Sequence, residues 1–408
     1  MLLSLPNALT LIMLCSLTAS SVNAKPSTGI RLRVYAGRYA RTDTPVRWSI
    51  PESLSLKGEY ELVQTSTGKA IPVQRDGDRA LVWILPGTLE AGDVATFDVS
   101  ERHSETSVSA SDLDKKHLLF RARGHSVMRY NYGLMNPPAE IESIYARSGY
   151  IHPIWSPSGR IVSNDFPENH KHHHGIWFPW TGTVFEGREV DFWNSGKGQG
   201  KVECTGVDGF VEGAVFAGFG SRHRFIDLTA PGSPKEALKE SWKVKVYPHT
   251  DYFLGDFRSV QECAGPSPLK LKKYRYGGFG FRGSGQWEGI DGCEYLTSEG
   301  RTRLNGHATT ARWCAIFGKV DGATVGITFF CHPNNFRAPQ NMRIHPKEPF
   351  FNFAPCQAGD FEIVPDQPYE SRYRFVVYDG VPNVVEMERL WHDYAYPPVV
   401  NVDHAPKG

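Results

Sequence analysis

ESWKVKVYP at residues 240–248 and YFLGDFRSV at residues 252–260 are two short runs of largely apolar residues that are typical of β-strands. Short apolar runs of this kind recur from residue 117 to residue 379, with almost no helical periodicity among them. Two sheets packed face to face would bury these runs and limit the number of exposed strand edges. The sequence therefore predicts an all-β fold built on a large antiparallel β-sandwich.

A second block of strand-like runs precedes this region. LRVYAG, VRWSI and ALVWIL are short, partly alternating and separated by turn residues. They predict a small Ig-like β-sandwich over residues 25–101, with a structural or substrate-presenting role because it holds no cluster of histidines, cysteines or acids. The polar, serine-rich residues 102–116 are then a linker to a large sandwich domain over residues 117–408, which contains the expected site.

One helix is expected in the C-terminal part of the chain. Asn383 can cap it, and Glu386 follows three residues later, as in a capping box. The helix should end before Pro397 and pack across the large sandwich.

The first 24 residues have the features of a signal peptide. Their apolar segment is too short to span a bilayer, and Val22-Asn23-Ala24 is similar to a cleavage site. We therefore expect a periplasmic or secreted protein that is cleaved after Ala24 and has no transmembrane segment in its mature chain. Six cysteines remain after cleavage, and in an exported protein they can either form disulfides or stay free thiols.

The charges of the chain nearly balance, with 45 Lys and Arg residues against 44 Asp and Glu residues. Nucleic-acid binding needs a basic surplus or patch, so we expect no nucleic-acid partner. GGFGFRG at residues 277–283 is not a dinucleotide-binding motif because no helical pattern follows it.

The functional site is expected in residues 169–193, which read NHKHHHGIWFPWTGTVFEGREVDFW and combine histidines, aromatic residues and acids. Imidazoles can ligate zinc, copper or iron, or act as general acid or base near neutral pH. In an extended segment, alternate side chains share a face, so His170, His172 and His174 would point the same way. A solvent-exposed polar loop is the alternative interpretation.

The pattern H-x-H-H-x-G-[I/L]-W, followed by V-D-F-W, resembles the soluble bacterial family that carries the name PmoA. It matches His170, His172, His173 and Asp191, and HPIWSPSG, GGFGFR and HPNN agree elsewhere. The resemblance implies that these three histidines, rather than His174, form the site, on a turn rather than on a regular strand. The family name is shared with a subunit of a methane monooxygenase and implies a metal-dependent oxidoreductase that uses copper or iron.

The C-terminal half is also similar, at the level of fold, to the large β-sandwiches of the galactose mutarotase superfamily. DFEIVPDQPYESRYRFVVYDG at residues 360–380 resembles the segment that closes such a sandwich. This resemblance implies a histidine–carboxylate pair in a concave sugar site.

Three residues outside the histidine run complete the expected site. Asp191 lies between apolar residues and should orient a histidine or act with it. Glycines around Arg282 allow close backbone approach, and His332 follows a strongly apolar strand, so both should reach the same cleft. The candidate catalytic residues are His170, His172, His173, Asp191, Arg282 and His332, and the candidate substrate-binding residues are Trp177, Trp180, Trp193 and Asn335.

The leading hypothesis is a carbohydrate-active enzyme that performs glycosidic cleavage or sugar proton transfer on a carbohydrate or glycoside substrate. One alternative is a metal-dependent oxidoreductase, in which His170, His172 and His173 bind copper, iron or another divalent metal such as zinc. The other is a non-catalytic glycan-binding protein, in which tryptophans such as Trp177, Trp180 and Trp193 stack on sugar rings.

Overall fold

The structure, a computed structural model, describes residues 27–102 and 104–404. The predicted signal peptide lies outside these residues. Within them nearly all regular structure is β, which confirms the predicted fold class. The described helices are α1 (Val384–Ala395) and the short 3-10 helices η1 (Ser143–Tyr145), η2 (Glu168–His170), η3 (Ser195–Lys197), η4 (Gly285–Trp287) and η5 (Pro355–Ala358).

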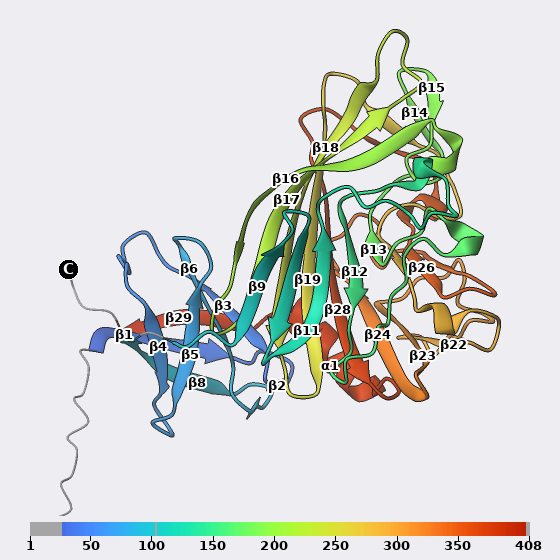
Figure 1. Ribbon diagram of the computed structural model, residues 1–408. Helices are drawn as coiled ribbons and strands as arrows, with labels where there is room; N and C mark the ends of the chain where they lie inside the picture. The colour runs from blue at the N-terminus through green and yellow to red at the C-terminus, as the bar shows by residue number, and fades with distance from the viewer. Residues whose placement is uncertain (1–26, 103, 405–408) are drawn as a thin grey trace, which may run out of the picture.

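Two eight-stranded antiparallel sheets form the large sandwich (Figure 1). The first sheet contains, in spatial order, β16 (Gly200–Val211), β17 (Ala217–Asp227), β18 (Lys235–Pro248), β19 (Tyr252–Cys263), β28 (Tyr369–Asp379), β24 (Ala323–Cys331), β23 (Trp313–Val320) and β22 (Cys293–Thr297). The second sheet contains β25 (Met342–Ile344), β26 (Phe350–Phe353), β21 (Gly280–Arg282), β13 (Ile176–Trp177), β12 (Tyr150–Ile154), β11 (His125–Asn131), β10 (His117–Ala122) and β9 (Val108–Leu113).

The alternation within β18 explains why the two sheets pack together. Successive side chains of a strand point to opposite faces. Trp242, Val244 and Val246 are buried, whereas Lys243 between them is exposed. The ring of Trp242 lies 6.0 Å from that of Tyr130 on β11, so the core of the large sandwich lies between the sheets.

Helix α1 covers the outer face of the first sheet. The predicted cap is confirmed, because the side chain of Asn383 accepts hydrogen bonds from the backbone N–H groups of Val385 at 3.1 Å and Glu386 at 3.3 Å. Met387, Leu390 and Trp391 belong to an apolar cluster with residues of β19, β23, β24 and β28. No helix among the described residues has the length and apolar character needed to cross a membrane.

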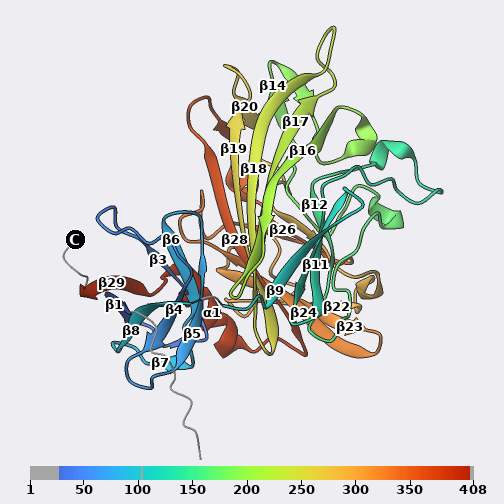
Figure 2. The same ribbon diagram turned by 60° about the vertical axis from the view of Figure 1, so that its left-hand side comes forward.

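The small domain lies beside the large sandwich (Figures 1 and 2) and has its own core around Leu32, Leu62, Trp83 and Phe97. Its seven-stranded sheet contains, in spatial order, β29 (Val399–His404), β1 (Ser27–Tyr35), β8 (Val94–Glu101), β4 (Tyr60–Gln64), β5 (Ala70–Arg75), β6 (Ala80–Ile84) and β3 (Pro45–Ser49). A short ribbon joins β2 (Arg41–Thr42) to β7 (Thr88–Leu89).

Two segments differ from their predicted places. Strand β29 pairs with β1, so residues 399–404 of the predicted large domain complete the sheet of the small one. The predicted linker at residues 102–116 contains β9, which pairs with β10. In β9 only Val108 and Ala110 are buried, and they alternate with exposed or half-buried polar residues, so the segment has the polarity of a linker although it forms a strand.

A four-stranded sheet adjoins the large sandwich, near the top of Figure 1. The strands of this sheet are β15 (Arg188–Val190), β14 (Thr183–Phe185), β20 (Leu269–Leu271) and β27 (Phe361–Ile363).

The sequence allowed the cysteines either to form disulfides or to stay free. In the structure, each of the six described cysteines is a free thiol.

Candidate functional site

The histidine run lies on a turn, as the family resemblance implied. Helix η2 ends at His170, and β13 begins at Ile176. The backbone N–H of His173 donates to the carbonyl of His170 at 2.7 Å and closes the turn. A side chain at Gly175 would clash with the carbonyl oxygen of Ile151, so a glycine is needed where the turn joins the second sheet.

The turn brings three imidazoles together at the start of β13, where the second sheet places the end of β21 and the start of β26 beside it. The ring of His173 lies 4.7 Å from that of His170 and 4.7 Å from that of His172. His173 is buried, whereas His170 and His172 are partly exposed, so the cluster opens to solvent on their side. A fourth imidazole, that of His345, lies 6.0 Å from His170.

His174 has a different environment from the other three. It is buried, and its Nδ1 lies 2.5 Å from Oδ1 of Asp165. The hydroxyl of Tyr150 donates to the other oxygen of Asp165 at 2.7 Å. His174 therefore forms part of a buried polar group beneath the turn and does not line the solvent-facing cluster.

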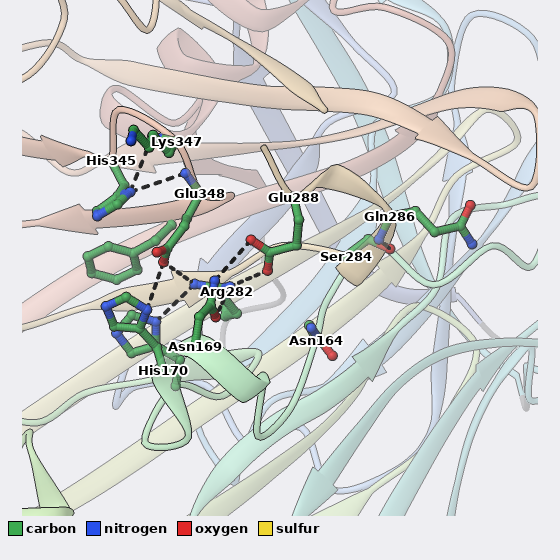
Figure 3. A network of polar contacts seen from close by, with 12 residues as sticks. Asn164, Asn169, His170, Arg282, Ser284, Gln286, Glu288, His345, Lys347 and Glu348 are labelled. Atoms are coloured by element: carbon green, nitrogen blue, oxygen red, sulfur yellow. Dashed lines mark hydrogen bonds and ion pairs between the residues drawn. The ribbon is translucent and has the colours of Figure 1, made fainter. Parts of the chain in front are cut away.

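Arg282 lies fully buried behind the histidines and is held by acceptors on several sides (Figure 3). Its Nη1 donates to Oε2 of Glu348 at 2.7 Å, and its Nη2 donates to Oδ1 of Asn169 at 2.9 Å and to Glu288. Nη1 also lies 3.3 Å from Nδ1 of His173. The guanidinium of Arg282 thus binds protein carboxylates from beneath the histidine turn.

Glu348 is the site residue that the sequence did not indicate. It follows β25 in the polar segment HPKEP, which is typical of a surface turn. The turn is held because the backbone N–H of Glu348 donates to Nδ1 of His345 at 3.1 Å. Its carboxylate is thereby directed at Arg282 and at His170, whose Nδ1 lies 2.9 Å from Oε2 (Figure 3).

The environment keeps most of the imidazoles neutral. Burial lowers the pKa of His172 to about 3 and that of His345 to about 4, and it lowers the pKa of His173 well below its ordinary value. Burial would raise the pKa of Glu348, but the neighbouring His170 and Arg282 outweigh it and lower that pKa to about 2. A neutral His173 beside an ionised Glu348 is in the protonation state that metal ions bind.

His170, His173 and Glu348 could hold a metal ion, since one ligand atom from each lies within 4.8 Å of the others. Nδ1 of His170 is buried and has no partner in hydrogen-bond geometry among the described residues, although Glu348 is close. Two imidazoles and a carboxylate form a donor set found for catalytic zinc and non-haem iron. Glu348 thus takes the place in the candidate set that the sequence prediction gave to His172.

Asp191 lies close to the cluster, but its oxygens are already engaged. It accepts hydrogen bonds from the backbone N–H groups of Trp193 at 3.0 Å and Asn194 at 2.9 Å, and from Lys197 at 2.8 Å. Burial would raise the pKa of Asp191, but these hydrogen bonds lower it. Asp191 therefore fixes the segment that carries Trp193, whose ring lies 6.2 Å from His173.

The three candidate tryptophans are fully buried, which does not fit their predicted role as stacking faces for sugars. Trp177 and Trp193 pack behind His173 together with Phe350. Trp180 lies in the main core, where its Nε1 donates to Gln261 at 2.6 Å. Aromatic residues next to histidines are found both in clefts and in cores, and here they support the turn from beneath.

His332 and Asn335 do not join the cluster, contrary to the prediction of one shared cleft. The ring of His332 lies 5.0 Å from that of Tyr394 on α1, and Asn335 binds the backbone of Arg372 at 2.7 Å and 2.8 Å. Strand β24 belongs to the sheet that α1 covers, so the residues after it emerge at the helix. The direction of this strand end could not be read from its apolar composition.

Comparison with known proteins identifies a family. The model described as "Family of unknown function (DUF6807)" matches residues 117–392, and the chain belongs to this family. The matched region includes both sheets of the large sandwich except β9, together with the histidine turn, Arg282 and Glu348. No curated protein matches the chain significantly.

Two solved structures share a weak likeness with the chain. A heparan sulfate lyase HepC mutant from Pedobacter heparinus is 11% identical with a TM-score of 0.30, over 67% of this chain and 37% of the lyase. A galactose mutarotase related enzyme from Lactobacillus acidophilus is 7% identical with a TM-score of 0.29, over 67% of this chain and 97% of that enzyme. At these scores the likeness supports no inference about the reaction.

Proposed function

We propose that the protein is a carbohydrate-active enzyme whose site is the group His170, His173 and Glu348, and that this group holds a divalent metal. The observation that carries the proposal is the meeting of these three ligand atoms within 4.8 Å of one another, at the ends of strands β13, β21 and β26. The buried Arg282 fixes the carboxylate from behind, while His170 leaves the group open to solvent on one side. A three-ligand group with an open side is typical of catalytic rather than structural metal sites.

The metal and the residues around it would have different roles in the reaction. A bound metal would polarise a sugar oxygen or activate a water molecule. His173 and Glu348 are held from beneath and would fix the position of the ion, because neither can move without disturbing Arg282. His172 stays outside the ligand set but lies against His173, where its neutral imidazole can accept a proton from a bound substrate.

A metal-dependent oxidoreductase is the second candidate, and the nature of the ligand set favours it. Two histidines with one carboxylate form the set that non-haem iron oxygenases use. The resemblance to the PmoA family points the same way. The two candidates share the ligands and differ in the metal, because zinc carries no redox chemistry whereas iron does.

We also propose that the chain is exported to the periplasm or beyond, on the basis of the signal-like first 24 residues. N-terminal sequencing of the exported protein should begin at Lys25. An intact Met1 on exported material would contradict this proposal.

The central test combines metal analysis with turnover. The purified protein should contain about one equivalent of a divalent metal, and it should act on at least one member of a polysaccharide panel in a chelator-sensitive manner. Glu348→Gln should lower both metal content and turnover, because an amide replaces a charged oxygen ligand.

Glu142→Gln is the matched control. Glu142 is an exposed carboxylate that forms an ion pair with Lys171, a residue of the histidine turn. Glu142→Gln therefore makes the same chemical change as Glu348→Gln without altering a proposed ligand. A metal content that Glu348→Gln leaves unchanged would remove the proposed ligand set. Iron with oxygen-dependent turnover would select the oxidoreductase.

A further inference from the structure

A basic cleft of about 700 Å³ is lined by residues outside the candidate metal group. Its floor is tied together by Gln357, whose Nε2 donates to the backbone carbonyls of Arg275 at 2.8 Å and Met342 at 3.2 Å. The lining contains no acidic side chain. The lining residues used below are Lys273, Tyr274, Arg275, His307, Asn341 and Gln357.

The cations around this cleft lack acidic partners. Among the described residues, neither Lys273 nor Arg275 has a carboxylate within ion-pair distance of its side chain, and the same holds for Arg343 on β25. Nη1 of Arg343 instead lies 3.3 Å from Nε2 of His307. Three positive charges therefore gather in one place, and none of them has an ion-pair partner among the described residues. The nearest acids are Glu348, which acts on Arg343 through space, and Asp360, which accepts a hydrogen bond from the backbone N–H of Lys273 at 2.6 Å.

Arg343 is the most informative member of this group. It is half-buried, and its Nε is shielded from solvent with no hydrogen-bond partner among the described residues. Burial lowers its pKa, and the nearby Arg275 lowers it further. Removing a guanidinium from water without a carboxylate is costly, so this arrangement suits a site that an anion completes.

The cleft is connected to the histidine cluster by direct contacts. The guanidinium of Arg275 lies 5.6 Å from the centre of the Tyr276 ring, and Tyr276 packs 5.1 Å from Trp193, which lies against His173. On the other side, β25 leads from Arg343 to His345, whose ring lies 6.0 Å from His170. Because Trp193 is fully buried, a molecule bound in the cleft would extend to the metal group along the β25 side, past His345.

We propose that this cleft binds an anionic substituent of the substrate, a carboxylate or a sulfate ester, and hence that the enzyme acts on an acidic carbohydrate. Arginine matches both groups through paired hydrogen bonds. The amide oxygen of Asn341 and the hydroxyl of Tyr274 supply neutral partners for sugar hydroxyls. The inference rests on the proposed function, because it names the substrate of that same site.

The test uses calorimetric titration of the full protein with sodium sulfate, sodium glucuronate and glucose, at constant ionic strength and with chelator present. We expect at least one of the two anions to bind and glucose not to bind. The double variant Arg275→Gln, Arg343→Gln should bind that anion about tenfold more weakly or worse. Arg38→Gln, a change of the same charge at an exposed position of the small domain, should bind it as the wild type does.

The outcomes separate the two anion types and the two proposals. Binding of glucuronate alone identifies a carboxylate site, and binding of sulfate alone identifies a sulfate-ester site. If neither anion binds, or if binding survives in the double variant, the cleft is not an anion site. The titration needs neither metal nor turnover, so it is independent of the test of the proposed function. Anion binding without any carbohydrate turnover would count against the proposed function only. Turnover on neutral sugars without anion binding would count against this inference only.

Single variants keep the test informative if the double variant folds poorly. Among the described residues, the side chain of Arg275 has no hydrogen bond or ion pair and one cation–π contact, with Tyr276, so Arg275→Gln should leave the fold intact. Arg343→Lys keeps the charge and loses the paired hydrogen-bond geometry, so it should weaken anion binding less than Arg343→Gln does.

Discussion

The guanidinium of Arg282 lies directly behind Glu348, with Nη1 2.7 Å from Oε2, and the side chain of this arginine is wholly shielded from solvent. A second carboxylate, Glu288, and the amide of Asn169 occupy Nη2. Since every arm of the guanidinium but Nε has an acceptor, Arg282 fixes the candidate metal group from within the protein.

Arg282→Gln should therefore be strongly destabilising. It leaves Glu348 and Glu288 without their buried cation, and breaking a buried pair in this way typically costs about 3–5 kcal/mol. Urea unfolding measures the loss. Arg258→Gln is the control, because Arg258 and its partner Glu370 are both partly exposed and such pairs contribute about 0–1 kcal/mol. Equal losses in the two variants would show that Arg282 has no special structural role.

His172→Ala and His170→Ala should differ in their effect on the metal. His170 belongs to the candidate ligand set and His172 does not, so His170→Ala should lose metal whereas His172→Ala should retain it. Loss of a general acid or base typically lowers turnover by about 10²–10⁴-fold, and we expect this for His172→Ala at an unchanged melting temperature. Metal analysis of both variants measures the loss of metal, and thermal unfolding measures their melting temperatures. Metal loss in both would restore the ligand set predicted from the sequence.

A buried carboxylate in the main core should make stability depend on pH. Glu240 on β18 accepts from Ser259 at 2.5 Å and Gln261 at 2.9 Å, and its second oxygen lies 3.6 Å from Nδ1 of His223. Burial raises the pKa of Glu240 to about 7 from an ordinary value of 4.5. The folded state thus holds this proton more tightly, so the contribution to stability is complete below about pH 4.5 and is lost as the pH rises through about 7.

Glu240→Gln should remove this dependence. The variant should gain stability relative to the wild type between about pH 4.5 and 7, by roughly 1–3 kcal/mol at the upper end. The buried His223, whose pKa burial and Arg147 lower to about 3, gives an opposite trend that is present in both proteins and largely cancels in the difference. Denaturant unfolding between about pH 4.5 and 7 measures the difference in free energy of unfolding between Glu240→Gln and the wild type. A difference that stays constant with pH would contradict the prediction.

Arg343→Gln should raise the melting temperature of the ligand-free protein by a few degrees. The variant removes a half-buried cation that has no acidic partner among the described residues, and residues kept for binding often cost stability in this way. Arg38→Gln should leave the melting temperature unchanged. A lower melting temperature for Arg343→Gln would show that this arginine serves the fold.

The local parts of the fold could be predicted from the sequence, whereas its long-range pairings could not. The alternation of Trp242 and Val244 with lysines indicates a strand, and Asn383 indicates a helix start, because both signals depend only on neighbouring residues. Strand β29 pairs with β1 across more than 360 residues of sequence, and the sequence of residues 399–404 does not indicate which strand it pairs with.

The same division holds for the candidate site. His170 and His173 come together through one short turn, so their clustering is visible in the sequence. Glu348 reaches them from a distant segment, and only the pairing of β21 with β26 brings it there. His332 was wrongly placed because a strand end reveals its sheet only after folding, and the tryptophans lie inside because apolar faces beside histidines can be buried as well as exposed.

The pairing of β1 with β29 has a mechanical consequence. The chain crosses between the two domains once between β8 and β9 and again between α1 and β29, so two covalent connections join them. The buried pair of Arg41 and Asp393, 2.9 Å apart, fastens α1 to the small domain beside the second crossing. A domain that is joined at two separated points rotates less freely than a domain joined by a single linker. The small domain should therefore tumble together with the large one in solution.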